Sequence, residues 1–218
     1  MRSGITSLLA AVSFTAFSSF CFADQKIPFE LVDFQQYHTY QQYLKKSAKH
    51  KAFAVPQFME PGSAYGEGSS PEEAIQSAKK NCKEKYQWDC NIISIDGKIT
   101  SEKTRNIPKE ISEPAEIKSL NIDSQSDKVK KLFKNYYFKK AYQNAKANKA
   151  YATNNFGINA QGHLNAYITE EIAIERALFH CNRLAKKHKD PTQRQACYVV
   201  AVNDRLLSDN IENVLAQK

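Results

Sequence analysis

The histidines and the paired carboxylates are the side chains with which this chain could perform acid–base chemistry. The five histidines are His38, His50, His163, His180 and His188. None of them belongs to an HExxH motif, and none lies beside a Ser or Cys in a recognised nucleophile motif. The pairs Glu72–Glu73 and Glu170–Glu171 begin predicted helices, where acidic side chains stabilise the positive end of the helix dipole. We therefore predict no catalytic residue, and we identify no metal site and no cofactor motif.

A basic and aromatic segment, residues 128–149, is the clearest candidate for binding. It holds eight lysines and no acidic residue. Lysines interleaved with aromatic side chains can bind phosphates, acidic glycans or anionic lipid head groups. The candidate anion-binding residues are Lys128, Lys130, Lys131, Lys134, Lys139 and Lys140.

The alternative for this segment is a helix that packs into the core and carries a solvated lysine surface. On a helical wheel, Leu132 and Phe133 fall on one side, Phe138 and Tyr142 fall roughly opposite, and lysines lie on both sides. A helix that lies on a membrane surface would separate its basic face from its apolar face. The pattern therefore favours packing, with anion binding as the second interpretation.

The N-terminus has the three parts of a secretory signal peptide. A short basic start precedes the apolar, serine-rich residues 5–22, and Cys21 and Ala23 are small residues that suit cleavage after Ala23. A membrane anchor would need about 20 mostly apolar residues, and the bulky Phe20 does not fit a lipid-modified Cys21. No later stretch is long and apolar enough to span a membrane, so we expect a periplasmic or secreted protein.

The composition is that of a globular protein with excess positive charge. Of the 218 residues, 42% are hydrophobic and 25% are charged, which excludes a wholly disordered chain and a coiled-coil rod. The formal net charge is +8. Removal of residues 1–23 takes away Arg2 and no acid, which leaves 30 basic against 23 acidic residues and a charge of +7. Such a charge favours an acidic macromolecule or an anionic envelope component as partner, while no specific nucleic-acid motif is present.

An internal repeat organises the chain. The matched landmarks, in order, are Lys51 with Lys149, Ser70 with Thr169, Ala78 with Ala177, Cys82 with Cys181, and Ile92 with Val199. Each unit reads as a strand, a glycine-containing hairpin, a helix and a second strand. Ser70 and Thr169 have hydroxyls that can cap the helices, and Glu73 completes a capping box in the first unit.

Four cysteines remain after the predicted cleavage, an even number that suits an oxidising compartment. They are Cys82, Cys90, Cys181 and Cys197. Their spacing lacks the short CxxC intervals of most zinc sites. Four cysteines allow three pairings, and spacing alone excludes none of them. The repeat favours Cys82 with Cys90 and Cys181 with Cys197, because each unit then closes on itself.

A helix is expected to precede each unit. Tyr40, Leu44 and Ser47 stand at the same distances before Lys51 as Phe138, Tyr142 and Ala145 before Lys149. We therefore predict an α+β fold of two tandem repeats, each with a leading helix, a small antiparallel sheet, one packed helix and one disulfide. The predicted organisation is a signal peptide at 1–23, repeat 1 at 27–99, a linker at 100–126, repeat 2 at 127–207 and a C-terminal tail at 208–218.

The repeated string resembles small exported bacterial domains of unknown function that carry a cysteine pair. The string is Lys-Ala-aromatic-Ala, a glycine-containing hairpin, Glu-Glu-Ala-Ile, Cys and then Cys before an aliphatic strand, and it covers 51–97 and 149–204. The resemblance implies an α+β fold and a bacterial envelope or extracellular setting. It implies no catalytic residue. Pro56 after the first strand and the longer cysteine interval in the second unit depart from the pattern.

Two functions from different classes remain open at this stage. The first is a non-enzymatic binding or interaction protein of the envelope or extracellular space, which engages an anionic partner. The alternative is a secreted hydrolase or host-directed effector whose site forms at the junction of the two repeats, where residues distant in sequence can converge. A deep cleft that holds His180 or His163 near a carboxylate would favour this alternative.

Overall fold

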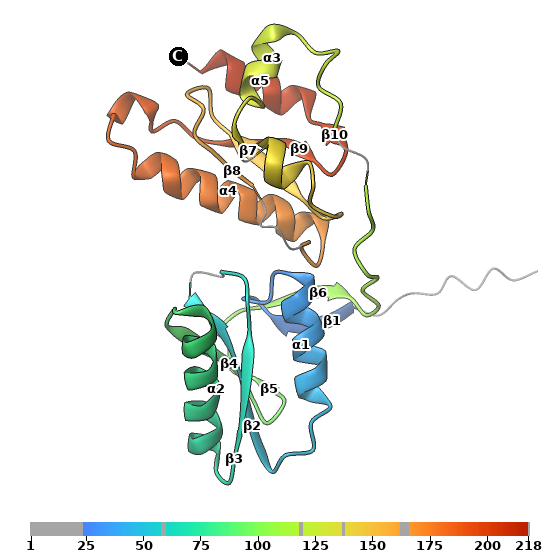
Figure 1. Ribbon diagram of the computed structural model, residues 1–218, viewed down its shortest axis with the longest axis vertical. Helices are drawn as coiled ribbons and strands as arrows, with labels where there is room; N and C mark the ends of the chain where they lie inside the picture. Colours follow the sequence, from blue (N-terminus) through green and yellow to red (C-terminus); the bar gives the residue numbers. More distant parts are fainter. Residues whose placement is uncertain (1–23, 58–59, 118–119, 137, 162–165, 218) are drawn as a thin grey trace, which may run out of the picture.

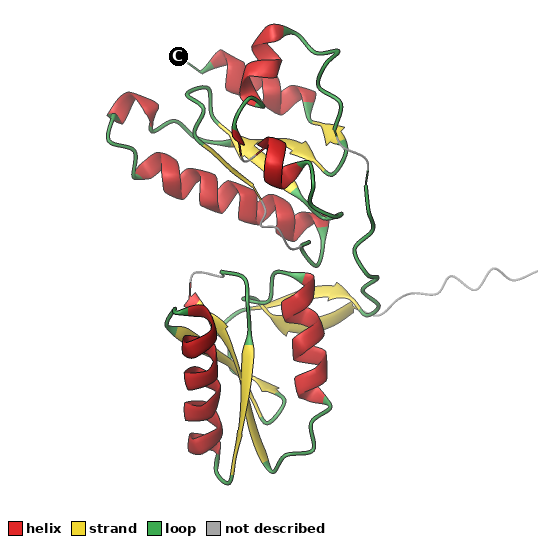
Figure 2. Cartoon of the chain, in the orientation of Figure 1, coloured by secondary structure: helices red, strands yellow, loops and turns green. Residues whose placement is uncertain are grey.

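Antiparallel sheets with helices packed on their faces make up the computed structural model, which describes residues 24–57, 60–117, 120–136, 138–161 and 166–217 (Figures 1 and 2). This mixed architecture confirms the predicted α+β class. The predicted signal peptide, 1–23, lies outside the described residues.

The first four-stranded sheet has the order β3-β2-β4-β5. Its strands are β2 (His50–Pro56), β3 (Ala64–Gly68), β4 (Cys90–Ile95) and β5 (Lys98–Ile99). Helix α2 (Pro71–Tyr86) lies on one face and α1 (Phe34–Leu44) on the other (Figure 1). Side chains alternate along β2, so Ala52 and Ala54 pack with α2 while Phe53 and Val55 belong to the larger core on the α1 side.

Small residues bring α2 unusually close to its sheet. A Cβ atom on Gly66 would lie 2.2 Å from the backbone nitrogen of Ala78, so only glycine fits there. Ser70 caps α2 as predicted, because its hydroxyl accepts from the N–H of Glu73. The predicted capping box differs by one residue: the Glu73 carboxylate accepts from the backbone and hydroxyl of Ser69 rather than from Ser70.

The second four-stranded sheet has the order β8-β7-β9-β10. Its strands are β7 (Ala150–Thr153), β8 (Asn159–Gln161), β9 (Tyr198–Val202) and β10 (Arg205–Leu206). Helix α4 (Glu170–Lys186) covers one face. The other face is covered by α3 (Asp127–Leu132), a π-helical turn (Phe138–Tyr142) and α5 (Ser208–Ala216) (Figure 1).

Two disulfides close the helices onto their sheets. One joins Cys82 in α2 to Cys90 at the start of β4, and the other joins Cys181 in α4 to Cys197 just before β9. These are the two pairs that the sequence favours.

The basic segment 128–149 is not one continuous helix. It forms the short α3 and the separate π-helical turn. The turn stacks the Phe138 and Tyr142 rings, four residues apart, whereas α1 stacks the Tyr40 and Tyr43 rings, three residues apart. Leu44, at the end of α1, is 37% exposed.

Two segments with weak sequence signals are more ordered than predicted. Within the predicted linker, β6 (Thr104–Pro108) pairs antiparallel with β1 (Asp24–Pro28). The predicted C-terminal tail forms α5, whose Ile211 and Val214 are buried. Ile107 is the one buried residue of β6, and Ile211 and Val214 are the buried residues of α5, so neither segment has a strong hydrophobic pattern for sequence reasoning to detect.

The two sheets belong to one packed body. The backbone N–H of Phe34 donates to Ala166, and that of Ile168 donates to Val32. One hydrophobic cluster extends from the α1 side of the first sheet to α4. The ion pair of Arg105 with Glu175, at 3.2 Å, also crosses the junction.

Candidate functional site

Two of the predicted anion-binding lysines line one pocket on the second sheet's outer layer. Lys128 and Lys131 stand three residues apart on α3, and residues at this spacing share a helix face. The pocket measures about 400 Å³. Its lining residues are Lys128, Lys131, Leu132, Asn155, Gly157 and Leu215. We refer to it as the basic pocket, because two lysines and, within the described part of the chain, no acidic residue line it.

Helix α3 is anchored so that its lysines face outward. The Ser126 hydroxyl accepts from the N–H of Val129 and caps the helix. Leu132 and Phe133 are buried, and the Phe133 ring packs against Phe138 and Tyr151. Lys128 and Lys131 are exposed at the other side of the short helix.

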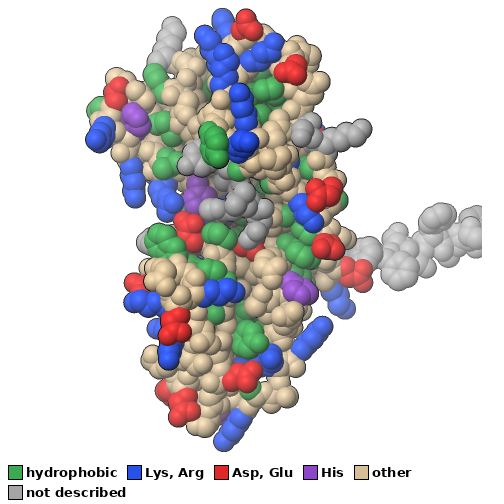
Figure 3. Space-filling view, viewed as in Figure 1, with side chains coloured by type: hydrophobic (Ala, Val, Ile, Leu, Met, Phe, Trp, Pro, Cys, Tyr) green, Lys and Arg blue, Asp and Glu red, His purple; other side chains and the backbone are tan. Residues whose placement is uncertain are grey.

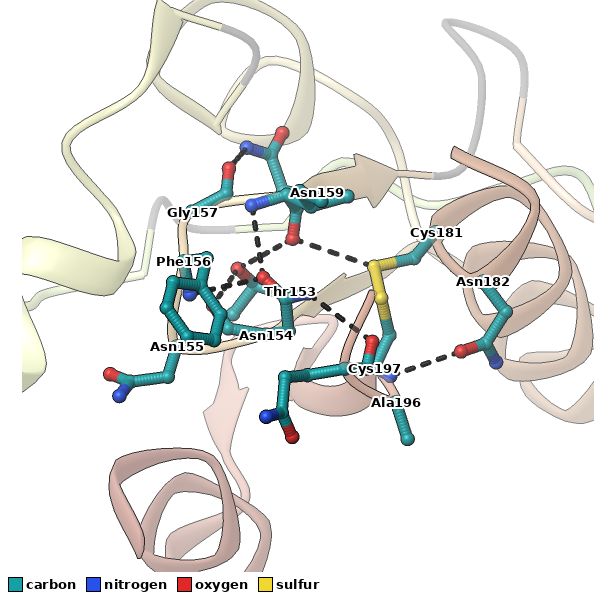
Figure 4. Close-up of a disulfide and its surroundings, with 12 residues drawn as sticks. Thr153, Asn154, Asn155, Phe156, Gly157, Asn159, Cys181, Asn182, Ala196 and Cys197 are labelled. Atoms are coloured by element: carbon teal, nitrogen blue, oxygen red, sulfur yellow. Dashed lines mark hydrogen bonds between the residues drawn. A yellow bond between two sulfur atoms is a disulfide. The ribbon is translucent and has the colours of Figure 1, made fainter. Parts of the chain in front are cut away.

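The opposite wall of the basic pocket is the loop between β7 and β8, which a buried asparagine holds in shape. The Asn154 side-chain oxygen accepts from the N–H groups of Phe156 and Ile158, and its amide donates to Gln193 and Gln195 carbonyls. The Cys181–Cys197 disulfide lies behind this loop, and Asn155 points away from it (Figure 4).

The C-terminal segment completes the basic pocket. The backbone N–H of Asn155 donates to the side-chain oxygen of Gln217, and the side-chain amide of Asn155 donates to the backbone carbonyl of Gln217. Leu215 of α5 lines the pocket floor beside Leu132. Sequence reasoning missed Asn155, Gly157 and Leu215, because nothing in their spacing links them to the lysines.

The other candidate lysines do not join this pocket. Lys130 lies 4.0 Å from the Asp127 carboxylate. Lys134, Lys139 and Lys140 are exposed and line no wall of it. On the face shown in Figure 3, Lys and Arg side chains lie at both ends of the molecule, with acidic side chains among them. Of the six lysines predicted to bind anions, Lys128 and Lys131 are therefore the two that line this pocket.

The aromatic residues of the basic segment serve mainly as core. Phe133, Phe138 and Tyr142 are almost fully buried, and burial raises the pKa of Tyr142 above its ordinary value. Tyr136, by contrast, is 70% exposed. The packing interpretation therefore holds for Phe133, Phe138 and Tyr142, which face the core and not the solvent.

His180 lies near the junction among arginines. Its Nε2 is 2.7 Å from an Arg176 guanidinium nitrogen, and its Nδ1 is 3.3 Å from one of Arg183. Arg183 also pairs with Glu60 of the first unit at 3.6 Å. The described contacts place the imidazole between two guanidinium groups. His163 lies outside the described residues.

His50 contacts the carboxylate of Asp96, which also holds the backbone at the start of β2. Its Nδ1 is 3.1 Å from Asp96, whose other oxygen accepts from the N–H of Lys51. These contacts hold the pKa of Asp96 below its ordinary value, with the Lys51 hydrogen bond as the main cause. Asp96 thus closes the turn between β4 and β5 onto the start of β2.

The described part of the chain brings no three His, Cys, Asp or Glu side chains together as a metal-binding group. None of its helices has the length and apolar character that crossing a membrane requires. Comparisons with protein-family models, curated proteins and solved structures found no match.

Proposed function

We propose that this chain is an exported, non-enzymatic binding protein that holds an acidic polymer at the basic pocket. The observation that carries the proposal is that Lys128 and Lys131 line one pocket together, with no acidic residue among its described lining. Two ammonium groups at a concave surface attract sulfate, phosphate or carboxylate groups more strongly than isolated surface lysines do.

A soluble acidic polymer fits this surface better than a lipid bilayer does. A membrane-surface helix inserts an apolar face among the lipid head groups. Here Leu132, Phe133 and Phe138 are buried in the protein, and α3 is only six residues long. We therefore assign the basic pocket to an acidic glycan.

Export into the periplasm or the extracellular space is part of the same proposal. Disulfides persist in oxidising compartments, and the described residues contain two. The predicted signal peptide supplies the route of export. Together these features support the resemblance to exported bacterial domains that carry one cysteine pair each.

We further propose that the two sheets are copies of one unit, as the sequence repeat predicts. The strand orders β3-β2-β4-β5 and β8-β7-β9-β10 correspond element by element. The register shift after Phe53 in β2 has a counterpart after Tyr151 in β7. A bulge is a local insertion that a sheet does not require at any particular position. Bulges at the same position in both sheets therefore support a common origin.

Two buried lysines support this duplication. The Lys51 ammonium donates to the Leu44 carbonyl at 2.9 Å and lies 5.2 Å from the Tyr43 ring centre. The Lys149 ammonium donates to the Ala145 carbonyl at 2.7 Å and lies 4.9 Å from the Tyr142 ring centre. Each lysine thus ties the start of a central strand to the helical turn before it.

Heparin chromatography over a salt gradient tests the glycan proposal. We expect the oxidised protein to be retained and to elute as salt rises, since salt weakens charge–charge attraction. Lys128→Gln/Lys131→Gln should elute at lower salt than Lys139→Gln/Lys140→Gln, although both variants lose the same net charge. Equal elution of the two variants, or weak and salt-insensitive retention of the wild type, would contradict the proposal.

A vesicle arm separates glycan from lipid binding. The wild type is mixed with vesicles of phosphatidylcholine and phosphatidylglycerol and sedimented. We expect the protein to remain in the supernatant at a salt concentration that permits heparin retention. Sedimentation with vesicles in the absence of heparin retention would refute the glycan assignment and indicate a lipid partner.

A further inference from the structure

The Cys181–Cys197 disulfide lies directly behind the loop that forms one wall of the basic pocket (Figure 4). Cys181 is fully buried and Cys197 is 5% exposed. The Cys181 sulfur lies 3.5 Å from the backbone carbonyl oxygen of Ile158, in the loop between β7 and β8. The same loop supplies Asn155 and Gly157 to the pocket. The bridge therefore reaches the pocket through this loop.

Asn154 joins the loop to the chain that precedes β9. It is fully buried, and its side-chain amide donates to the carbonyls of Gln193 and Gln195 at 3.1 and 3.3 Å. Its side-chain oxygen accepts from the N–H groups of Phe156 and Ile158, both at 3.1 Å. These four bonds form together only when the chain before β9 has a fixed place relative to the loop. Asn154 does not line the pocket itself, so it is a positioning residue.

The Gln217 side chain makes a second connection between the same parts. Its oxygen accepts from the N–H of Asn155 at 3.0 Å, and its amide donates to the Ala196 carbonyl at 2.7 Å. Ala196 precedes Cys197, whose N–H donates to the Asn182 side chain in α4 at 3.0 Å. The place of the chain just before β9 thus controls both the loop and the C-terminal segment of the basic pocket.

Little packing holds the chain between α4 and β9 in its place. None of residues 187–196 is buried. Cys197 is the first buried residue after Ala185. Without the disulfide this polar segment gains conformational freedom, because no buried side chain of its own offsets the entropy of ordering it. The covalent bond to α4 therefore fixes a segment that hydrophobic burial does not fix.

We propose that oxidation of Cys181 and Cys197 assembles the basic pocket, so that the chain binds its acidic glycan only after this bridge has formed. The two thiols lose two electrons and two protons and form one S–S bond. An oxidant that carries a disulfide takes up the electrons and protons and becomes two thiols. In the reduced chain the loop has no fixed position, and Lys128 and Lys131 bind anions only as separate surface lysines. The inference rests on the glycan function proposed above, and it makes an oxidising compartment a condition for binding.

Heparin binding by two disulfide variants tests the proposal. Cys181→Ser/Cys197→Ser removes the bridge behind the pocket, and Cys82→Ser/Cys90→Ser is the matched control, because that bridge lies in the first unit and lines no wall of the basic pocket. Both substitutions leave the net charge unchanged, since cystine and serine are neutral. We expect the first variant to bind heparin about tenfold more weakly at a fixed salt concentration, because binding must then order the loop. The control should bind like the wild type.

Combination with Lys128→Gln/Lys131→Gln separates loss of the pocket from general loosening of the fold. Where these two lysines are absent, the position of the loop has no bearing on the binding that remains. Removal of the Cys181–Cys197 bridge should therefore cause no further loss on this background, although it causes a tenfold loss in the wild type. A further tenfold loss on the lysine background would overturn the proposal.

Amide hydrogen exchange tests the loop without any glycan. The N–H groups of Phe156 and Ile158 should exchange at least tenfold faster in the variant without the Cys181–Cys197 bridge, and at the wild-type rate in the control. Where the bridge variant fails to fold, Gln217→Ala keeps both disulfides and removes the side chain that joins Asn155 to Ala196. It should weaken heparin binding about threefold, and wild-type binding of Gln217→Ala would then overturn the proposal.

Failure of this inference is distinguishable from failure of the glycan proposal. If Lys128→Gln/Lys131→Gln weakens heparin binding while the Cys181–Cys197 bridge variant binds like the wild type, the glycan proposal stands and the inference is wrong. Unchanged exchange at Phe156 and Ile158 also refutes the inference and leaves the glycan proposal intact. If the lysine variant binds like its control, the glycan proposal fails and the inference fails with it.

Discussion

Asp33 offers a sharp test of how burial controls the stability of this fold. It is 1% exposed and caps α1, where its Oδ1 accepts from the N–H of Gln36 at 2.7 Å. Burial raises its pKa from 3.8 to about 6, although backbone hydrogen bonds act in the opposite direction. We predict that Asp33→Asn makes the protein more stable at neutral pH, because asparagine caps helices as well as aspartate does and carries no charge.

The size and sign of the effect follow from the two pKa values. Between pH 3.8 and about 6 the folded protein keeps the Asp33 proton while the unfolded chain has lost it. The free energy of unfolding of the wild type therefore falls as pH rises through this window. Each pKa unit corresponds to about 1.4 kcal/mol, so the full penalty above pH 6 is about 3 kcal/mol. Asp33→Asn lacks this penalty at every pH.

Urea unfolding of both proteins at several pH values between 3.5 and 8 provides the assay. The difference in unfolding free energy, variant minus wild type, should increase by about 3 kcal/mol from the acidic to the neutral end. Any cost of burying the new amide is independent of pH and leaves this increase unchanged. A difference that stays constant, or that decreases toward pH 8, would refute the reasoning.

Asp190 provides the matched control. It caps the short 3-10 turn Pro191–Gln193, and its hydrogen bonds with Thr192 lower its pKa below the ordinary value. The stabilisation from this carboxylate is present above its unfolded pKa and is lost as pH falls. Asp190→Asn should therefore show a pH dependence opposite in sign to that of Asp33→Asn.

Two further predictions concern the disulfides and the close helix–sheet contact. Cys181→Ser/Cys197→Ser should lower the unfolding free energy by about 3 kcal/mol, because the disulfide closes a loop over a 16-residue separation. An unchanged urea midpoint of this variant would contradict the prediction. Gly66→Ala should cost about 2–3 kcal/mol, because its Cβ would collide with α2. Gly157→Ala is the control, since its Cβ meets no atom within 4 Å, and it should cost about 1 kcal/mol through its positive φ alone. If Gly157→Ala lowered the melting temperature more than Gly66→Ala did, the contact of Gly66 with α2 would not be tight.

The local features of the fold were predictable because each depends on residues that are near one another in the chain. Ser70 and Thr169 cap α2 and α4 as their positions predict. The cysteine pairs are 8 and 16 residues apart, and the repeat distinguished this pairing from the other two. The small residues Ala74, Ala78 and Cys82, four residues apart in turn, form the buried face of α2, and such a spacing is also local in the chain.

Other features escaped prediction because the decisive partner is distant. The π-helical turn places Tyr142 against Tyr151 and Lys149, and no local pattern in the sequence signals such a turn. Strand β6 was hidden in a polar segment, since its pairing with β1 joins residues about 80 positions apart. Pairing over such a distance depends on the closure of the whole first unit.

The candidate sites show the same division. The sequence by itself determined which lysines were available, the strand–hairpin–helix–strand order around each cysteine pair, and the cysteines that pair. Only the tertiary structure decided that Lys128 and Lys131 line one pocket with Asn155 and Leu215. The physical reason is that helix caps and helical periodicity depend on residues a few positions apart. A pocket and its charge depend on segments that are distant in the sequence and that meet only in the folded chain.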